Sequence, residues 1–231
     1  MDRQCFLTND GSHSIRVSPN LTYHSIHGAI SESMHVFIRS GFEYAAELWA
    51  GELQIFEVGF GTGLNAWLTM LSAGRLQRRV YYEAIEPLPL LVTEASTLNY
   101  PEELQAESGR EKFELLHSSP WERATGITAS FSFCKRQVTV DDYRTPLKFD
   151  VIYFDPFDPI AAPALWTFEV FAKLSSLLTD GGILVTYSSK GTVRRNMEAA
   201  GFLVEKLPGP AGKREIVRAI RRTRKIIQPT S

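Results

Sequence analysis

Short apolar runs alternate with segments of helical periodicity from residue 54 to the end of the chain. Apolar runs of about four to eight residues are typical of buried strands, and apolar residues three or four positions apart are typical of helices. The pattern predicts strands at residues 54–58, 79–85, 131–140, 149–154, 183–187, 202–207 and 215–220. It predicts helices at residues 64–73, 88–98, 102–116, 165–178 and 192–200. This alternation indicates an α/β fold with a mostly parallel, seven-stranded sheet and helices on both faces.

The first 50 residues do not follow this alternation. The tripeptide Asp10-Gly11-Ser12 indicates a hairpin turn, and residues 30–37 have the pattern of a short helix. We expect residues 1–50 to form an N-terminal extension that packs over the active site, residues 51–222 the main domain, and residues 223–231 a basic, flexible tail. Because ligands bind beyond the carboxyl ends of parallel strands, functional residues are expected directly after the predicted strands.

Composition changes this picture only through the distribution of charge. The 231 residues are 44% hydrophobic and 22% charged, with a net charge of −1, which argues against a generally basic nucleic-acid binder. The balance is uneven, because residues 190–231 hold 11 Lys and Arg against 3 Asp and Glu. Two distant cysteines, no signal peptide and no run of 18 apolar residues favour a reduced, cytoplasmic protein without a membrane span.

A glycine-rich loop follows the first predicted strand and opens a helix. It reads Glu57-Val-Gly59-Phe-Gly61-Thr-Gly63-Leu-Asn65, so its glycines follow a GxGxG pattern. Glycine allows a sharp turn and a close approach of the backbone to a ligand. The dinucleotide fingerprint requires glycine where Leu64 stands, and the Glu57 carboxylate would repel a phosphate. The pattern therefore favours a nucleoside cofactor with an amino-acid end; a tight turn without a ligand is the alternative.

Acidic residues end the next two predicted strands. Glu86 ends the second strand, where a carboxylate can accept hydrogen bonds from both ribose hydroxyls, and Glu83 is the weaker candidate. Asp141 and Asp142 follow the third strand, where an acid could accept a hydrogen bond from an adenine amino group; Asp141 is mildly preferred. Together with the glycine loop, these positions favour S-adenosyl-L-methionine over a nicotinamide dinucleotide as the cofactor.

The fourth predicted strand runs directly into Asp155-Pro156-Phe157-Asp158. This Asp-Pro-aromatic order is similar to the (Asp/Asn)-Pro-Pro-aromatic loop of amino methyltransferases. Methyl transfer to nitrogen needs an amine with its lone pair aimed at the methyl group, and a carboxylate can orient that amine and accept its proton. Asp155 is the first candidate for this role and for a cofactor contact, and Asp158 is the second. Phe157 could stack on a flat substrate or contact a cation. The alternative is that Asp155 merely caps the loop.

These motifs resemble the MnmC/MnmD methyltransferases, which methylate 5-aminomethyl-(2-thio)uridine at the tRNA wobble position. The matching segments are residues 27–38, 57–65, 153–157, 163–167, 186–195, 200–202 and 213–215, and those at 27–38 and 213–215 are the most specific to the family. The chain departs from the family at Val140, where glycine is usual, and at Pro156, where alanine or glycine is usual.

The resemblance implies a Rossmann-like class I fold, S-adenosyl-L-methionine as cofactor and a primary amine on tRNA as acceptor. It also implies a stand-alone methyltransferase form without flavin or metal. Its partners would be tRNA and either a separate oxidase or the machinery that aminomethylates the wobble uridine.

The remaining candidates concern the acceptor and the RNA. Glu32 and His35 share a helix face and could line a pocket, as could Tyr187 and Ser188 after the fifth strand, whereas Trp166 is expected in the core. Basic residues that could contact tRNA phosphates are Lys190, Arg194, Arg195, Lys213 and Arg214, extended by Arg218, Arg221, Arg222, Arg224 and Lys225. A solvated strand edge and tail are the alternative for these residues. The competing function is a small-molecule amine transferase, either aminopropyltransferase-like or another N-methyltransferase.

Overall fold

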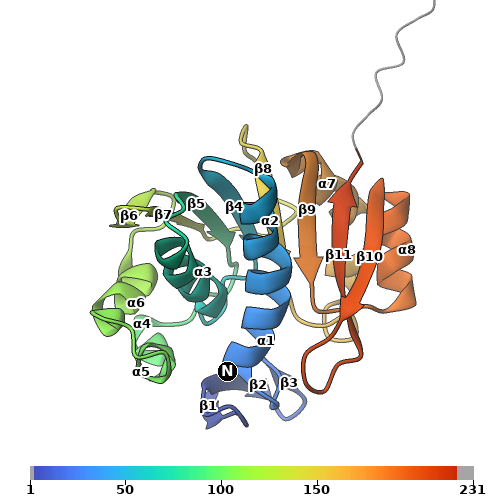
Figure 1. Cartoon of the computed structure of the whole chain (residues 1–231). Coiled ribbons are helices and arrows are strands. Elements are labelled where there is room, and N and C mark those ends of the chain that lie inside the picture. The colour runs from blue at the N-terminus through green and yellow to red at the C-terminus, as the bar shows by residue number, and fades with distance from the viewer. Residues whose placement is uncertain (1–2, 223–231) are drawn as a thin grey trace, which may run out of the picture.

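The computed structural model describes residues 3–222. These residues form a central sheet of eight strands in the order β10-β11-β9-β8-β4-β5-β7-β6 (Figure 1). The five strands from β9 to β7 run parallel, and β6, β10 and β11 are antiparallel to their neighbours. The strands are β4 (Leu53–Val58), β5 (Val80–Ile85), β6 (Thr125–Thr128), β7 (Phe131–Arg136), β8 (Phe149–Phe154), β9 (Leu178–Thr186), β10 (Phe202–Pro208) and β11 (Glu215–Arg221).

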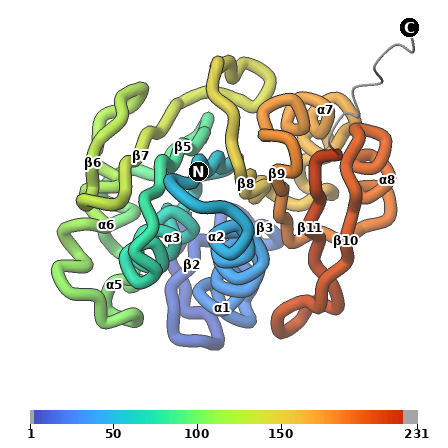
Figure 2. The backbone as a smooth tube through the Cα atoms, turned by 45° about the horizontal axis from the view of Figure 1, so that its top comes forward, coloured from blue at the N-terminus to red at the C-terminus, as the bar shows by residue number. Residues whose placement is uncertain are grey.

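Helices cover both faces of this sheet, as the sequence predicts. Side chains alternate along β4 and β8: Ile55 and Tyr153 pack into one core, and Phe56 and Phe154 pack into the other. The first core is shared with α1 (Ala29–Ser33), η1 (Met34–Glu43), α2 (Tyr44–Leu48), α3 (Leu64–Arg75) and α6 (Gly109–Ser118). The second is shared with η2 (Pro163–Trp166), α7 (Phe168–Leu177) and α8 (Gly191–Ala199). Figure 2 shows the two sets of helices on opposite sides of the strands.

The α/β prediction is confirmed, and several boundaries differ from the expected ones. The eighth strand, β6, was not expected, and β7 ends at Arg136 instead of residue 140. The segment 88–98 contains only the short helix α4 (Val92–Ala95). The expected helix at 102–116 is split into α5 (Tyr100–Glu103) and α6, since Gln105 and Ser108 adopt positive φ between them. β9 begins at Leu178 instead of residue 183, and its pairing with β8 is irregular between Leu178 and Ile183.

The N-terminal segment folds as a small sheet followed by one long helix. β1 (Gln4–Leu7), β2 (His13–Ser18) and β3 (Leu21–Thr22) are antiparallel, and the expected turn at residues 10–12 joins the first two. The expected helix at 30–37 extends from Ala29 to Leu48 through α1, η1 and α2, and its middle part has the wider turns of a π-helix. This small sheet lies at the end of the central sheet where the parallel strands finish (Figure 1).

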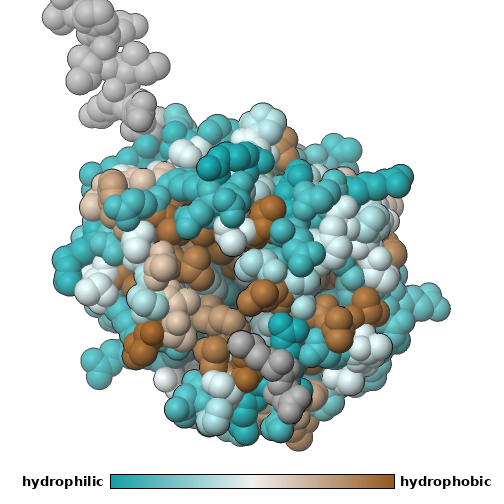
Figure 3. Space-filling model, turned by 180° about the vertical axis from the view of Figure 1, so that it is seen from behind, coloured by the Kyte–Doolittle hydropathy of each residue, from teal (hydrophilic) through white to brown (hydrophobic). Residues whose placement is uncertain are grey.

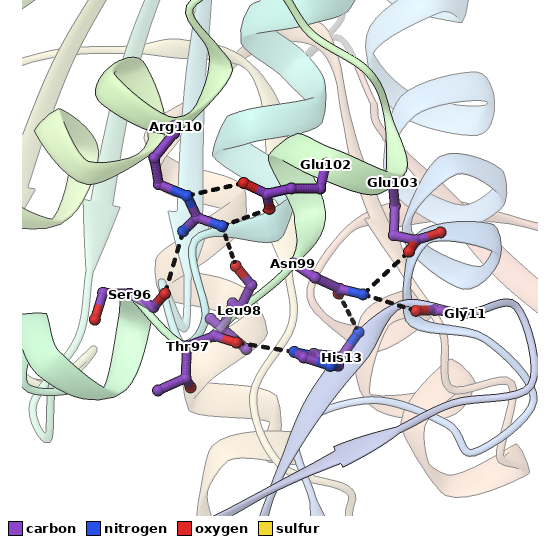
Figure 4. Close-up of polar contacts among 9 residues, drawn as sticks. All are labelled: Gly11, His13, Ser96, Thr97, Leu98, Asn99, Glu102, Glu103 and Arg110. Carbon is purple, nitrogen blue, oxygen red and sulfur yellow. Dashed lines mark hydrogen bonds and ion pairs between the residues drawn. The ribbon is translucent and has the colours of Figure 1, made fainter.

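Hydrogen bonds fasten the β1–β2 hairpin to the segment before α6 (Figure 4). The Asn99 side chain accepts from the His13 backbone N–H at 2.7 Å and donates to the Gly11 carbonyl at 2.8 Å. His13 Nδ1 lies 2.9 Å from the Thr97 carbonyl oxygen. Residues far apart in sequence therefore hold the N-terminal sheet in place.

The surface and the helix lengths add two observations. Seen from behind, hydrophobic and hydrophilic residues are interspersed on the surface (Figure 3). Among residues 3–222, no helix is long and apolar enough to cross a membrane.

Asp10 connects the hairpin to the long helix. Its carboxylate accepts hydrogen bonds from the Ser12 N–H at 3.1 Å, the Thr8 hydroxyl at 2.9 Å and the Ser31 N–H in the first turn of α1 at 2.8 Å. Gly28 approaches this carboxylate so closely that a Cβ atom would overlap it. Partial burial raises the pKa of Asp10, but the hydrogen bonds outweigh it and lower the pKa to about 2.

We predict that Asp10→Ala lowers the free energy of unfolding by about 1–3 kcal/mol, because four donors, the Ser12 hydroxyl included, lose their acceptor. The Asp10 pKa is below its ordinary value of 3.8, so this stabilisation is present above about pH 4 and is lost as the pH falls through about 2. Urea unfolding at pH 7 and pH 3 measures the effect. The matched control is Glu114→Ala, an exposed acid on α6 that should change stability by less than about 0.5 kcal/mol. Equal losses in the two variants would contradict the prediction.

Candidate active site at the carboxyl ends of the strands

A cavity of about 560 Å³ lies beyond the carboxyl ends of β4, β5, β8 and β9. Loops after these strands and the N-terminal segment build its walls. Most of the candidate residues line it, namely Glu32, Gly59, Gly61, Asn65, Glu86, Asp155, Phe157, Asp158, Tyr187 and Lys213. Glu57 and Gly63 lie behind this lining, and Asp141, Ser188, Lys190, Arg194, Arg195 and Arg214 are not part of it.

The glycine loop is shaped by two close approaches. Gly59 adopts φ +93°, and a Cβ atom there would lie 2.7 Å from the backbone oxygen of Asp155. Gly61 adopts φ +50°, and a Cβ atom there would lie 2.9 Å from the ring of Tyr23. Both positions therefore require glycine. The loop is consequently packed against β8 on one side and against the N-terminal segment on the other.

The side chain of Asn65, in the first turn of α3, joins the first and fourth strand ends. Its amide nitrogen donates to Glu57 Oε1 at 2.9 Å and to Asp155 Oδ2 at 2.8 Å. These two acceptors determine the orientation of the amide, because a carboxylate accepts hydrogen bonds and an amide oxygen cannot donate them. Asn65 thus connects Glu57, before the first glycine, with Asp155, which opens the loop after β8. This loop, residues 155–158, is called the acceptor loop.

Both acids have raised pKa values. Burial is the main cause of the rise in the pKa of Glu57, and the nearby charge of Asp155 adds to it against the hydrogen bond from Asn65. Burial likewise raises the pKa of Asp155, the Glu32 charge adds to the rise, and Asn65 and Lys213 oppose it. A carboxylate with a raised pKa is a better acceptor for the proton of an ammonium ion.

The structure separates the two acids of the second strand. Glu83 is fully buried and accepts hydrogen bonds from Arg136, Tyr81 and Tyr143, so its carboxylate is occupied in the core. Glu86 lines the cavity and accepts from the backbone N–H groups of Gly61 at 3.0 Å and Leu88 at 2.9 Å. Each of its oxygens keeps a further lone pair for a ligand.

The acids after the third strand lie outside the cavity. Thr139 and Val140 line it, whereas Asp141 and Asp142 are exposed. Asp142 accepts from the Thr139 hydroxyl at 2.7 Å. Asp141 was expected at the end of a strand spanning residues 131–140, but β7 ends four residues earlier, at Arg136, and the structure leaves Asp141 outside the cavity lining.

The acceptor loop after β8 is held at several points. The Tyr187 hydroxyl donates to the Pro156 carbonyl at 2.8 Å, and the buried Trp166 indole N–H donates to the Phe157 carbonyl at 2.9 Å. The Phe157 ring lies 5.4 Å from that of Tyr23, and Asp158 accepts from the Ile160 N–H at 2.7 Å. Trp166 is therefore part of the core, as expected, and also positions the acceptor loop.

Lys213 lies in the β10–β11 loop and reaches into the cavity. Its ammonium group forms an ion pair with Glu32 and lies 4.1 Å from the centre of the Tyr187 ring. The expectation that Lys213 contacts a phosphate on the surface is not supported by this placement.

The other basic residues divide into two groups. Lys190, Arg195, Arg214 and Arg222 are exposed, and Arg194 donates to the Ser189 carbonyl. Arg218 pairs with Glu205 and packs on the Tyr44 ring, and Arg221 pairs with Asp180, so both are engaged within the domain. Ser188 is buried. Arg224 and Lys225 lie outside the described residues.

Several cavity residues were missed by the sequence analysis, and two of them make specific contacts. Tyr23 packs against both Gly61 and Phe157, and Arg3 donates to the carbonyls of Leu88 and Pro89 beside Glu86. Both come from the N-terminal segment, where no motif marked them. In the chain described, residues 3–222, no three His, Cys, Asp or Glu side chains converge in a way that could hold a metal ion.

Residues 122–222 match the model of a protein family described as S-adenosyl-L-methionine-dependent methyltransferase. The chain is 33% identical, over 91% of its length, to the "tRNA 5-methylaminomethyl-2-thiouridine biosynthesis bifunctional protein MnmC" of Cupriavidus metallidurans. It covers 32% of that protein, so it spans about a third of the length of the curated relatives it matches.

Two solved structures share the fold. MNMC2 from Aquifex aeolicus superposes with a TM-score of 0.75 at 24% identity, covering 94% of this chain and 69% of that one. Spermidine synthase from Thermotoga maritima gives a TM-score of 0.52 at 12% identity, covering 94% and 72%. These comparisons confirm the resemblance to the MnmC methyltransferases and the Rossmann-like fold that it implies.

We predict that Glu86→Gln weakens binding of S-adenosyl-L-methionine about 10- to 100-fold, because a charged acceptor becomes a neutral amide whose single oxygen can accept from only one of the two backbone N–H groups, those of Gly61 and Leu88. Isothermal titration calorimetry measures the dissociation constant. Asp141→Asn is the comparison variant and should bind the cofactor as the wild type does. A large loss in Asp141→Asn with none in Glu86→Gln would contradict this assignment.

Proposed function

We propose that the protein transfers a methyl group from S-adenosyl-L-methionine to the primary amine of 5-aminomethyl-(2-thio)uridine at the wobble position of tRNA. The observation that carries this proposal is the Asn65 contact, which holds the acid of the acceptor loop beside the glycine loop. The sequence similarity to MnmC supports the nucleoside acceptor, although this chain spans only part of that protein's length.

The residues present fit the cofactor. Gly59 and Gly61 bring backbone close to the cavity, and Glu86 supplies a carboxylate for the ribose hydroxyls. The buried oxygen Asn65 Oδ1 has no hydrogen-bond partner among the described residues, so it can accept from the amino group of a methionine moiety. When bound, S-adenosyl-L-methionine supplies an electrophilic methyl group on a sulfonium.

The acceptor side is built for an amine. Asp155 accepts hydrogen bonds from the acceptor nitrogen, orients it and takes up the proton that an alkylammonium must lose before attack. The rigid loop formed by Pro156 and Phe157 positions that carboxylate through the contacts of Tyr187 and Trp166. The Phe157 ring faces the cavity, where it can contact the flat base.

The test is to incubate the protein with methyl-labelled S-adenosyl-L-methionine and tRNA from cells that lack the wobble modification. Digestion to nucleosides then shows where the label resides. Label on the wobble nucleoside is the expected result. Label only on an added free polyamine would support the alternative of a small-molecule amine transferase and overturn the proposal.

We predict that Asp155→Asn lowers the rate of methyl transfer at least about 100-fold while cofactor binding persists, because the amide cannot accept the proton. Asp158→Asn should lose less, since the Asp158 carboxylate accepts from the Ile160 N–H within the loop. Single-turnover rates and calorimetric cofactor affinity separate the two effects. Full activity in Asp155→Asn would disprove the assigned role.

Exposed basic residues near the acceptor side are proposed to contact RNA phosphates. Arg214 adjoins the cavity residue Lys213, and Lys190 and Arg195 follow Tyr187 closely in sequence. Phosphate contacts release counterions, so binding should weaken as salt rises.

We predict that the double variant Arg195→Ala/Arg214→Ala lowers the slope of log affinity against log salt by about 1–2. Fluorescence anisotropy with labelled tRNA at several salt concentrations measures it. Arg123→Ala, an exposed arginine beside β6, is the control and should leave the slope unchanged. An unchanged slope in the double variant would show that Arg195 and Arg214 do not contact tRNA phosphates.

The division into a 1–50 extension, a 51–222 domain and a 223–231 tail is retained as part of this proposal. A cytoplasmic location, and a separate oxidase or aminomethylation system that supplies the amine, belong to the same proposal.

A further inference from the structure

The ammonium group of Lys213 is held as a cation inside the cavity. It pairs with Glu32, lies 4.1 Å from the centre of the Tyr187 ring, and is only 29% exposed. A carboxylate and an aromatic face are the groups that bind an ammonium ion most favourably. The second oxygen of Glu32 accepts from the Ser25 N–H at 3.0 Å, which fixes the carboxylate in place.

The loop that carries Lys213 is itself anchored. His35 Nε2 lies 2.7 Å from the Pro208 carbonyl oxygen, and the His27 ring packs against Gly212. The N-terminal segment and the β10–β11 loop therefore determine together where the Lys213 charge lies. This location differs from that of the adjacent Arg214, which is exposed.

Tyr187 connects the position of Lys213 with that of Asp155. The Tyr187 ring lies beneath Lys213, and its hydroxyl donates to the carbonyl oxygen of Pro156, the residue that follows Asp155. Burial dominates the raised pKa of Asp155; the Glu32 charge adds to it, and the Lys213 charge opposes it. The Lys213 charge is therefore close enough to act on a group bound at Asp155.

The acidic lining of the cavity disfavours the neutral, reactive form of an amine acceptor. An alkylammonium ion has no lone pair, and an alkylamine is ordinarily protonated at neutral pH, as the lysine value of about 10.4 illustrates. Negative charge nearby stabilises the ammonium form further. Four carboxylates line the cavity, those of Glu32, Glu86, Asp155 and Asp158. Without a compensating cation, they would hold the acceptor in its unreactive form.

We infer that Lys213 is an electrostatic positioning residue that neutralises Glu32 and favours the neutral, nucleophilic form of the acceptor amine beside Asp155. The inference rests on the proposed amine acceptor. In the proposed methyl transfer, the acceptor ammonium gives its proton to Asp155, and the freed nitrogen lone pair forms the new bond to the methyl carbon. The C–S bond breaks, its electron pair stays on sulfur, and the product is a secondary ammonium ion.

The charged and titratable groups that face this position come from several elements. They are Glu32 of α1, His24 after β3, Asp155 and Asp158 after β8, and Tyr187 after β9. Burial lowers the pKa of His24 to about 4, so it is neutral at the pH of the assay. Burial also raises the pKa of Tyr187, which keeps its phenol protonated. Arg3 also lines the cavity, but its guanidinium group pairs with Glu94 and donates to the carbonyls beside Glu86. Lys213 is therefore the cation on the Asp155 side of the cavity whose removal should shift the acceptor equilibrium.

The experiment compares the pH dependence of kcat/KM for wild type, Lys213→Met and Lys213→Arg with undermodified tRNA between pH 6 and pH 10. The acidic limb of this profile is the range in which kcat/KM rises with pH. In Lys213→Met it should move to higher pH by about one unit. Below the limb its kcat/KM should then be about tenfold lower than that of the wild type, and it should recover at high pH. Lys213→Arg keeps the charge and should keep the limb near its wild-type position.

Two further variants separate charge from structure. Lys206→Met removes the same charge from an exposed position of the same hairpin, where Lys206 pairs with Glu215, and should leave the profile unchanged. Glu32→Gln/Lys213→Met removes both members of the pair and should return the limb toward the wild-type position. Calorimetric cofactor affinity confirms that each variant is folded.

Each outcome is decisive. A limb in Lys213→Met that coincides with that of an active wild type would overturn the role of Lys213 and leave the proposed function intact. Equal upward shifts in Lys213→Met and Lys213→Arg would also overturn it, because the charge would then be irrelevant. A wild type that transfers no methyl group to the tRNA would refute the proposed function, and the inference with it.

Discussion

The candidate site depends on the adjacency of β4 and β8, whose carboxyl ends meet around the side chain of Asn65. The two strands are parallel neighbours, so Glu57 on the first and Asp155 after the second lie at the same edge of the sheet. Asn65, in the first turn of α3, donates one amide hydrogen to each. The absence of a Cβ at Gly59 allows the loop to pass beside the Asp155 backbone. These contacts connect the cofactor side of the cavity with its acceptor side.

The electrostatic consequence follows from burial. Two acids close to each other in a poorly solvated place resist carrying two negative charges, and burial raises the pKa of both. The amide of Asn65 supplies donors to both without adding charge, and Lys213 contributes a positive charge between Glu32 and the Tyr187 ring. An acid with a raised pKa is suited to receive a proton from an ammonium ion, so the arrangement that stabilises the strand ends also serves the proposed chemistry.

Much of the fold could be predicted from the sequence, since β4, β5, β8 and their flanking helices have strong periodicity and clear glycine boundaries. The glycine loop and the acceptor loop could be located because they directly follow those strands. The strand predicted at residues 131–140 was too long because apolar alternation continued past Arg136, where β7 ends, and Asp141 lies outside the cavity lining. Tyr23 and Arg3 could not be found, because only tertiary packing brings the N-terminal segment over the cavity.

The location of Lys213 also depends on tertiary packing and could not be predicted from the sequence. A basic residue in a basic region suggests a phosphate contact, whereas the fold turns Lys213 inward to Glu32, 181 positions away in sequence. Its neighbours Arg218 and Arg221 are used in ion pairs within the domain. Charge counts along the chain therefore indicate a basic region without showing which of its members face solvent.

The most direct test of the coupling at Asn65 is a double-mutant cycle on the single-turnover rate of methyl transfer to undermodified tRNA, measured at a concentration of S-adenosyl-L-methionine that saturates every variant. The four proteins are wild type, Asn65→Ala, Asp155→Ala and the double variant. If Asn65 acts by holding Asp155, the double variant should be about as slow as Asp155→Ala alone, because the two losses share one cause. Losses that multiply independently would show that Asn65 and Asp155 act separately and would contradict the account.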